Sequence, residues 1–596
     1  RDTVGVQVRS LGGEYATVSI RGSSAEQVVI YLDGIPLNRA LGGAVNLADL
    51  PLGQVESIEV YRGFTPAGLP AASIGGAVLI HTRRAKAAPA ATVSASIGSY
   101  GSGEAIASVS GSRGRGDFAL GFDGATGRGD FLFFDNNGTP HEPADDADAR
   151  RVNNDFRRGN LSGRLTLRSG DRARLSVATD LLARDQGVPG LDCCLSPDAR
   201  HSTTRWLVRP ELEVPGLLGG RVLARVAADY TDYREAFDDP EGEISLSIVP
   251  IGYRNRTRSL GGEAGLVVAA PRQAISFLAA RRRETAGLED RALPGPDDLG
   301  RAARTTTVLT LENQVSLASD RLVFNPSLRY EAYDSSFDPG GAGGLVPPPS
   351  GDRYTTGKVG FRIRLGDAWI LRGNAGRFVR LPDFVELFGN RGSVRGNPAL
   401  SPERGRSLDL GVTASWRRPG CLLRSARAET TLFETVADDL IQFVPNSQST
   451  VLAENLDRAR IRGVELSLLL GLGSRFSGGL NLTHQTPRDI SGRLTGGNLL
   501  PGRPRDELSA SASLDLGRGR LFYEFTYVGR NFVDPPNTPS AALPARYLHD
   551  AGFHLRLRTG LTATLEAKNL GNERTYDYAR FPLPGRSVHG RVSWEF

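Results

Sequence analysis

Two different patterns of hydrophobic and polar residues divide the chain. Residues 1–87 contain short, continuous apolar runs, such as Val28–Leu32 and Ile58–Val60, which are separated by glycine turns. From about Ala91 to the last residue, apolar and polar positions alternate strictly. A period of two is typical of strands with one apolar and one polar face, whereas the first pattern predicts a compact mixed α/β unit. We therefore expect two domains, 1–87 and 88–596.

The alternating segments also predict where hairpins turn. Leu161–Leu167 alternates, Ser169–Asp171 has the composition of a turn, and Ala173–Ala183 resumes the alternation. Leu508–Val528 repeats this arrangement around a glycine turn, and Ser587–Phe596 alternates as a closing strand. A soluble β-propeller is the alternative, but its blades would repeat every ~40–50 residues with a recognisable signature, and the sequence has no such repeat.

Turn lengths indicate a transmembrane β-barrel. Brief glycine-rich turns alternate with long polar loops, for example residues 130–158, 184–204 and 236–256, and this asymmetry is expected when the two rims of a barrel face different compartments. The stretch from Ala88 to Phe596 suffices for roughly 22 strands at about 23 residues each. The predicted fold is thus an all-β membrane protein, a roughly 22-stranded antiparallel transmembrane β-barrel with a small α/β plug domain in its lumen.

Composition narrows the function classes. The 72 basic residues exceed the 66 acidic ones slightly, and lysine occurs only at Lys86, Lys358 and Lys568. The acidic residues are interspersed with the arginines, and no basic patch with interleaved aromatic residues stands out, so we expect no nucleic-acid partner. The 7 histidines are scattered without an HExxH motif or a convincing triad. This pattern predicts no enzyme and no cofactor.

Two groups of residues have open alternatives. Cys193 and Cys194 are adjacent, so they can form at most a vicinal bridge, and with Cys421 they cannot form a disulfide framework. Free thiols or one local bridge in a loop are favoured over a metal site. An acidic run invites a calcium site but lacks the spacing of a defined calcium loop, so a solvated loop neutralised by Arg150 and Arg151 is favoured. That run consists of Glu142, Asp145, Asp146, Asp148 and Asp155.

Four blocks stand out in order within the N-terminal unit: Ser19–Gly22, Val28–Asn38, Val55–Gly63 and Gly75–Thr82. Together they resemble the plug of TonB-dependent receptors of the siderophore and cobalamin type. The chain departs from the family pattern at Phe64–Pro70, where a differently shaped loop is expected. The barrel carries further family marks at Pro382–Gly389, Gly396–Glu403, Ala453–Leu466, Asn569–Asn572 and Pro584–Arg586. The resemblance therefore spans essentially the whole chain.

This resemblance implies active import of a scarce nutrient across the bacterial outer membrane. The sequence has no Walker motif, so the family's inner-membrane motor is expected to supply energy through TonB. Arg1–Arg9 resembles a point already inside the plug, so we expect the first plug segment and the TonB-binding peptide to be missing. Terminal Phe596 resembles the signal that the outer-membrane assembly machinery reads, and lipid surrounds the barrel. A passive porin or adhesin is the alternative from another class, since it needs no TonB-binding peptide.

The resemblance also implies two sets of site residues. Family members hold the plug by charges in the lumen, and Arg21 and Arg62 on the plug with Glu403 and Glu465 on the barrel look like the matching set, which we call the latch. A buried pair contributes little net stability, but loss of one partner is costly, which suits a releasable latch. The alternative is that both arginines simply bond plug carbonyl groups.

Ligand is expected at the plug apices, Leu11–Tyr15 and Asn38–Asn46. The candidate binding residues are Glu14, Tyr15, Asn38, Arg39 and Asn46, although each also fits a solvated turn. Arginine-rich loops suit an anionic ferric siderophore, which is the first choice of ligand. The modest length of the chain resembles that of cobalamin receptors, so cobalamin is the second choice. Copper is disfavoured because the sequence has no Met and few His.

Overall fold

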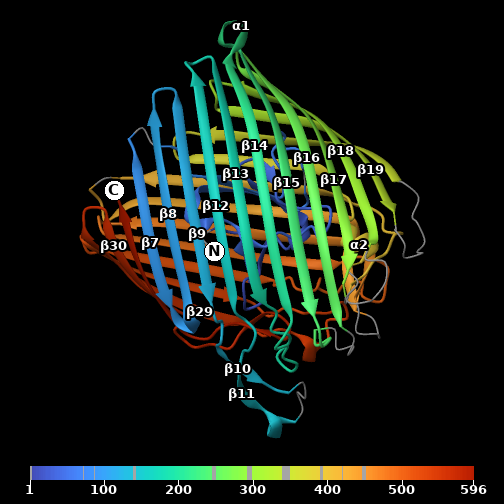
Figure 1. Cartoon of the computed structure of the whole chain (residues 1–596). Helices are drawn as coiled ribbons and strands as arrows, with labels where there is room; N and C mark the ends of the chain where they lie inside the picture. Colours follow the sequence, from blue (N-terminus) through green and yellow to red (C-terminus); the bar gives the residue numbers. More distant parts are fainter. Residues whose placement is uncertain are drawn as a thin grey trace.

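A computed structural model describes residues 3–71, 73–85, 88–137, 142–244, 250–291, 298–338, 350–389, 394–418, 420–445 and 451–596. These residues form one closed antiparallel barrel of 22 strands around the N-terminal unit (Figure 1). The last strand pairs with the first, with Val592 opposite Ala95, and this pairing closes the cylinder. The strands are β7 (Ala90–Gly98), β8 (Ser102–Arg113), β9 (Gly116–Gly127), β12 (Phe156–Ser169), β13 (Ala173–Gly187), β14 (Arg200–Gly216), β15 (Val222–Asp239), β16 (Ile251–Ala270), β17 (Gln273–Asp290), β18 (Asp298–Leu317), β19 (Leu322–Asp338), β20 (Ser350–Leu365), β21 (Trp369–Arg380), β23 (Glu403–Arg417), β24 (Leu423–Pro445), β25 (Val451–Leu472), β26 (Phe476–Asp489), β27 (Asp506–Asp515), β28 (Gly519–Val528), β29 (Arg546–Arg558), β30 (Leu561–Lys568) and β33 (Ser587–Glu595).

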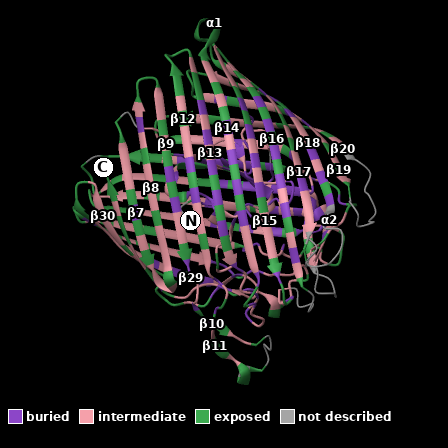
Figure 2. Cartoon of the chain, in the orientation of Figure 1, coloured by how far each residue is buried: buried purple, intermediate pink, exposed green. Residues whose placement is uncertain are grey.

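Both predicted hairpins are confirmed, and the alternation explains which face each side chain takes. In the β12–β13 hairpin, Leu161 lies opposite Leu181. Leu161 and Leu165 are 50% and 51% exposed on the outer surface, whereas Asn160, which points to the other face of the strand, is buried. Exposed and buried residues alternate in this way along the barrel strands (Figure 2). The barrel therefore presents an apolar outer belt and a polar lumen, as predicted for a membrane barrel.

The two rims differ as expected. One rim carries short turns, including α1 (Leu217–Gly220), and lies at the top of Figure 1. The other carries long loops with the hairpin of β10 (Leu132–Asp135) and β11 (Ala147–Arg150), the short helix α2 (Phe384–Phe388), and β31 (Tyr576–Tyr578) with β32 (Phe581–Pro582). In the same rim, β22 (Val394–Arg395) pairs in parallel with β25. We call these the short-turn rim and the long-loop rim. No helix among the described residues is long and apolar enough to cross a membrane.

The N-terminal unit fills the lumen and consists of two small sheets. β1 (Val6–Ser10) pairs with β2 (Ala16–Ile20), and a second sheet has the order β4 (Ile35–Pro36), β3 (Val28–Leu32), β6 (Gly76–Thr82), β5 (Val55–Arg62). Three 3-10 helices connect them: η1 (Ala25–Gln27), η2 (Leu47–Asp49) and η3 (Leu52–Gln54). Its buried core includes Ile20, Val28, Ile30 and Ile80, and Leu207 of the barrel joins this cluster. The predicted domain boundary after residue 87 falls at residues 86–87, which lie outside the described residues.

Candidate functional site

Two plug arginines converge on one buried carboxylate of the barrel. Arg21 follows β2, and its Nε donates to Glu465 Oε1 on β25 at 2.9 Å. Arg62 ends β5, and its Nη1 donates to Glu465 Oε2 at 2.8 Å. Glu429 on β24 accepts from Arg62 Nη2 at 2.7 Å, and Asp409 on β23 lies 3.4 Å from Arg21 Nη1. The plug and strands β23–β25 are thus joined by a network of two cations and three carboxylates.

The alternative role of these arginines, in which they bond carbonyl groups of the plug, is seen for Arg62 only in part. Arg62 Nη1 also donates to the Val4 carbonyl at 3.3 Å, within the plug. The hydrogen bonds of the Arg21 guanidinium, by contrast, go to the carboxylates of Glu465 and Asp409. The Arg21 guanidinium also lies 4.8 Å from the ring centre of Phe433. The geometry of an interdomain ion-pair network is therefore present, and its role as a releasable latch stays a prediction.

Glu403 contacts neither Arg21 nor Arg62, which corrects its predicted grouping. It is the first residue of β23 at the long-loop rim, whereas Glu465 lies midway along β25, so the two carboxylates face different parts of the plug. Glu403 accepts from Gln27 Nε2 of the plug at 3.0 and 3.1 Å, and from Arg380 of the barrel at 2.8 Å. The plug partner here is a neutral amide, which charge pattern alone does not reveal.

Asn38 holds the second plug apex in shape. Its Oδ1 accepts from the Ile30 backbone N–H at 2.8 Å, and its Nδ2 donates to the carbonyl groups of Val28 and Gly43 at 2.8 and 2.7 Å. These three bonds use most of the capacity of one amide side chain. Asn38 therefore shapes the apex, and any contribution to ligand binding from its side chain would compete with that role.

Asn46 has the same kind of structural role and connects the two apices. It caps η2 by accepting from Ala48 N–H at 3.1 Å, accepts from Ala16 N–H at 2.9 Å, and donates to the Glu14 carbonyl at 2.8 Å. The Glu14 carboxylate itself pairs with Arg158 of β12 at 3.2 Å. Burial raises the pKa of Glu14, and Arg158 opposes this shift. Both residues are thus engaged in plug and barrel contacts.

The plug apex and the long-loop rim enclose a cavity of about 530 Å³, which we call the outer cavity. A cavity of ~300–1,000 Å³ is typical for small-molecule sites. Among the predicted residues, Tyr15, Arg39 and Asn46 line it, whereas Glu14 and Asn38 do not. Its aromatic walls come from Tyr15 of the plug and from Tyr233, Tyr253, Phe337, Phe388 and Phe443 of the barrel. Residues far apart in the sequence thus build one ring-lined site.

The arginines that line the outer cavity have carboxylate partners. Arg39 lies 3.3 Å from Glu235 and stacks 3.7 Å above the ring centre of Tyr233. Burial by itself lowers the pKa of Arg39, but Tyr233 and Glu235 more than offset this and raise it. Arg184 lies 3.0 Å from Asp49 of η2. Both charges are therefore neutralised within the protein, which the arginine-rich sequence did not show.

The segment at the start of α2, which contains none of the predicted site residues, connects the plug apex to the barrel. Asp383 Oδ2 accepts from Gly43 N–H at 2.8 Å, and the Phe384 N–H donates to the Ala40 carbonyl at 2.6 Å. Asp383 and Glu386 form a capping box that starts α2. The sequence signal was present as the D-x-x-E spacing in a family block, although such a box by itself indicates only a helix start.

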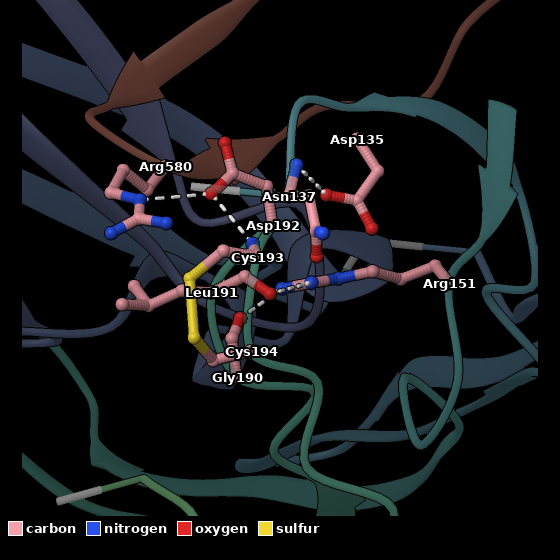
Figure 3. Close-up of a disulfide and its surroundings, with 9 residues drawn as sticks. All are labelled: Asp135, Asn137, Arg151, Gly190, Leu191, Asp192, Cys193, Cys194 and Arg580. Atoms are coloured by element: carbon pink, nitrogen blue, oxygen red, sulfur yellow. Dashed lines mark hydrogen bonds and ion pairs between the residues drawn. A yellow bond between two sulfur atoms is a disulfide. The ribbon is translucent and has the colours of Figure 1, made fainter. Parts of the chain in front are cut away.

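Cys193 and Cys194 form a vicinal disulfide in the loop between β13 and β14 (Figure 3). Arg151 from the preceding loop donates to the carbonyl groups of Gly190 and Leu191, the latter at 3.1 Å. Burial lowers the pKa of this arginine to about 10. Asp192 accepts from Arg580 Nε at 3.0 Å and thereby links the loop to the β31–β32 hairpin. Hydrogen bonds from Arg151 and Arg580 therefore fix the loop that contains the disulfide. Cys421 is free and exposed in a short turn.

The acidic run in the loop before β12 is dispersed. Asp148 pairs with Arg574 at 2.8 Å, and Asp155 pairs with Arg200 at 2.9 Å. Arg150 lies 3.4 Å from Asp130, outside that run, and Arg151 bonds carbonyl groups, so neither neutralises the run as expected. Among the described residues, no group of three or more His, Cys, Asp or Glu side chains is placed to hold a metal ion.

Comparisons with known proteins agree with the architecture. Residues 97–570 match the family described as TonB dependent receptor-like, beta-barrel, and residues 1–77 match the TonB-dependent Receptor Plug Domain. The vitamin B12 transporter BtuB of Vibrio vulnificus strain CMCP6 is 22% identical over 605 residues, covering 99% of this chain and 88% of the relative. The BtuB proteins of Vibrio cholerae are 38% identical over 101 residues, so this chain covers only 16% of their length.

Solved structures share the fold at low sequence identity. The copper transporter OprC superposes with a TM-score of 0.84 at 15% identity, covering 100% of this chain and 94% of OprC. The FrpB iron transporter of Neisseria meningitidis, F3-3 variant, superposes with a TM-score of 0.79 at 15% identity, covering 100% of this chain and 96% of FrpB. With its 22-stranded barrel, its lumenal plug and both family matches, the chain belongs to the TonB-dependent receptors, which are transporters of the bacterial outer membrane.

Proposed function

We propose that this protein imports a ferric siderophore across the outer membrane, with the outer cavity as its binding site and TonB as the source of energy. The observation that carries the proposal is the ring-lined cavity of about 530 Å³ between the plug apex and the long-loop rim. Long loops of outer-membrane barrels lie on the extracellular side. A ligand there contacts plug residues such as Tyr15 and barrel residues such as Tyr253 together. Flat aromatic faces offer large contact areas to a bulky chelate at little cost in side-chain entropy.

The plug supplies the gate in this mechanism. A barrel of 22 strands encloses a lumen wide enough to need filling. Arg21, Arg62 and Glu465 hold the plug to the wall through buried ion pairs. Force applied by TonB from the short-turn side would separate these charges, and the cost of leaving them unpaired returns the plug once the force ends. Transport then alternates between a bonded and a displaced plug.

Cobalamin is the second candidate, because the cavity offers little free positive charge. Arg39 and Arg184, which line it, are each paired with a carboxylate, so an anionic chelate finds no uncommitted arginine among the described lining residues. The match to vitamin B12 transporters along 99% of the chain points the same way. A copper site is disfavoured because the chain has no Met and His201 is the single imidazole in the described lining.

Calorimetry on the detergent-refolded receptor separates these ligands. The protein is titrated with ferric enterobactin and, separately, with cyanocobalamin. Tyr253→Ala removes a ring from the cavity, and Tyr547→Ala, which is 48% exposed on the outer surface, is the matched control. We expect ferric enterobactin to bind saturably and to lose at least about tenfold in affinity in Tyr253→Ala only.

The other outcomes assign the function differently. Binding of cyanocobalamin alone, with the same sensitivity to Tyr253→Ala, replaces the siderophore with the second candidate. Binding of neither ligand, together with a steady ion conductance in planar bilayers, would support the passive porin instead. Equal losses in Tyr253→Ala and Tyr547→Ala would show that the effect is on folding rather than on the cavity.

A further inference from the structure

A second cavity of about 180 Å³ lies between the plug and the barrel wall at β15–β19 and β21, and we call it the inner cavity. It shares four lining residues with the outer cavity, namely Glu26, Arg39, Gly43 and Asp383, so the two are contiguous. The outer cavity touches β16 at Tyr253 and Asn255, whereas the inner one touches it from Gly261 to Glu263. At ~3.3 Å per residue, Asn255 and Gly261 are roughly 20 Å apart along the strand, in the direction of the short-turn rim.

The wall of the inner cavity combines small residues, such as Gly261 and Ala280, with charged side chains. Gly261 of β16 lies opposite Arg282 of β17, and Arg282 lies opposite Thr306 of β18. A Cβ atom at Gly261 would approach Asp229 Oδ1 to 2.7 Å and Arg282 Nη2 to 2.8 Å, so a larger residue would collide with the wall. Ala280 is the next small residue on the same face of β17. Gly261 therefore leaves the room that the Asp229 and Arg282 side chains occupy in the wall.

Two ion pairs of this wall lie entirely within the barrel. Arg282 of β17 bonds Asp229 of β15 at 2.8 Å, and Arg209 of β14 pairs with Glu263 of β16. Within the part of the chain that the structure describes, β16–β18 bond the plug through one hydrogen bond, in which Glu284 accepts from Ala40 N–H at 3.1 Å. Ala286 and Ala302 also pack against the plug apex. Moving the plug away from this wall would therefore break the hydrogen bond of Glu284 but leave these two ion pairs of the wall intact.

Two contacts separate the inner cavity from the outer one. Arg39 and Glu235 form an ion pair at 3.3 Å, with 16% and 14% of their side chains exposed, and Gly43 N–H donates to Asp383 at 2.8 Å. Partly hydrated pairs are cheaper to part than the nearly dry pair of Arg21 and Glu465, whose side chains are 5% and 1% exposed. Arg39, Gly43 and Asp383 line both cavities, so these two contacts lie where the cavities meet.

From this geometry we infer that the imported ligand leaves the outer cavity between the plug and strands β16–β18, through the inner cavity. This inference rests on the proposed transport function and adds the path. At about 180 Å³ the inner cavity is smaller than the ~300 Å³ of typical ligand sites, so it widens only when the plug shifts. The ion pairs within its wall neutralise charges that would otherwise bind a bulky, polar chelate tightly.

Another cavity of about 460 Å³ between plug and barrel provides the rival path and the control. It lies at β7–β9 and β12 and touches Gln54, Arg83 and Glu595, so it opens at the short-turn rim. It shares no lining residue with the outer cavity. Arg164 in its wall forms an ion pair with Asp33 of the plug at 2.7 Å. Passage on this side would require that pair to break.

Blocking each cavity in turn tests the path in cells that produce the full-length receptor and TonB. Ala280→Trp fills the inner cavity, and Ser108→Trp fills the rival one. Uptake of iron-55 ferric enterobactin and cobalt-57 cyanocobalamin is measured alongside binding of each to the purified variant. We expect Ala280→Trp to retain binding within about twofold and to lose uptake at least about tenfold, while Ser108→Trp retains both. Loss of uptake in Ser108→Trp with normal uptake in Ala280→Trp overturns the inference.

A labelling experiment decides the same question without a ligand. Ala280→Cys and Ser108→Cys are each made in a Cys421→Ser background, because Cys421 is the exposed free thiol. Cells are treated with a water-soluble maleimide, with and without a protonophore that removes the proton-motive force. We expect energisation to accelerate labelling of Ala280→Cys and to leave Ser108→Cys unchanged.

The labelling outcomes separate the path from the proposed substrate. Energy-dependent labelling of Ala280→Cys without uptake of either probe supports the path and rejects both substrate assignments. An energy-dependent rise at Ser108→Cys alone, or an equal rise at both positions, overturns the path, since the plug would then leave on the other side or as a whole. No energy dependence at either position overturns both the path and the transport function.

Discussion

The plug meets the walls at β23–β26 and at β16–β18 in opposite ways. On the β23–β26 wall, Glu465 and Glu429 bond plug arginines, and Thr483 accepts from the Gly5 N–H at 3.2 Å. On the β16–β18 wall, charged residues such as Arg282 and Glu263 bond neighbouring strands instead. Both walls consist of the same kind of inward-facing polar strand. A charged residue of the barrel wall therefore holds the plug only if its ion-pair partner lies on the plug. If the partner lies on another strand of the barrel, the pair does not attach the plug.

The largest effect that separates the two walls is expected from Glu465→Gln. This change leaves Arg21 and Arg62 without their shared carboxylate in a buried site, which costs about 3–5 kcal/mol. We expect the plug to be released at a lower urea concentration. The measurement is the urea midpoint for the rise in ion conductance of the receptor in planar bilayers.

Asp229→Asn is the matched control on the other wall. Its carboxylate is as buried as that of Glu465, but it pairs with Arg209 and Arg282 of the barrel. The urea midpoint for conductance should therefore stay close to that of the unchanged receptor. Equal early release of the plug in both variants would show that the two walls do not differ in the way that we describe.

An intermediate effect is expected from Asn38→Ala at the apex above the inner cavity. The substitution leaves the Ile30 N–H and the Val28 and Gly43 carbonyl groups short of a partner, at about 1–3 kcal/mol for each group that stays buried. We expect faster hydrogen exchange across 37–45 and weaker ligand binding, with the urea midpoint of plug release nearly unchanged. Weaker binding with unchanged exchange would instead indicate direct contact between Asn38 and ligand.

The smallest effect is expected from the double substitution Cys193→Ser with Cys194→Ser. A bridge between adjacent residues closes a minimal loop and restricts the unfolded chain little, and Arg151 and Arg580 still hold the segment. We expect a change below about 1 kcal/mol. Limited proteolysis of intact cells checks it, with Arg151→Ala as the control that loosens the same loop more. Greater cleavage in the double variant than in Arg151→Ala would refute this ranking.

Much of the barrel followed from local patterns. Alternation at Leu161–Leu167 and Leu508–Leu516 placed strands and faces correctly, because side chains of a strand point to opposite faces whatever its partners are. Strand ends were less accurate. The loop expected at residues 184–204 is shorter, since β13 continues to Gly187 and β14 starts at Arg200. Polar residues near a rim look like loop in a sequence, yet they can continue a strand above the lipid.

The candidate site was less accessible to sequence reasoning. Resemblance pointed to Arg21, Arg62 and Glu465, which the structure brings together, but it also grouped Glu403 with them, and Gln27 is the plug residue that bonds Glu403. Paired side chains here are hundreds of residues apart in the chain. No local pattern encodes such a distance.

What the sequence by itself determined is therefore the kind of structure: alternating strands in sufficient number, a separate N-terminal unit, and the family blocks. Only the tertiary structure decided which charges meet. Arg39 and Arg184 look like free cations in the sequence, and the folded chain neutralises them with Glu235 and Asp49. The direction of a side chain is a local property of its strand, whereas its partner depends on how strand register and barrel closure bring distant strands to the plug.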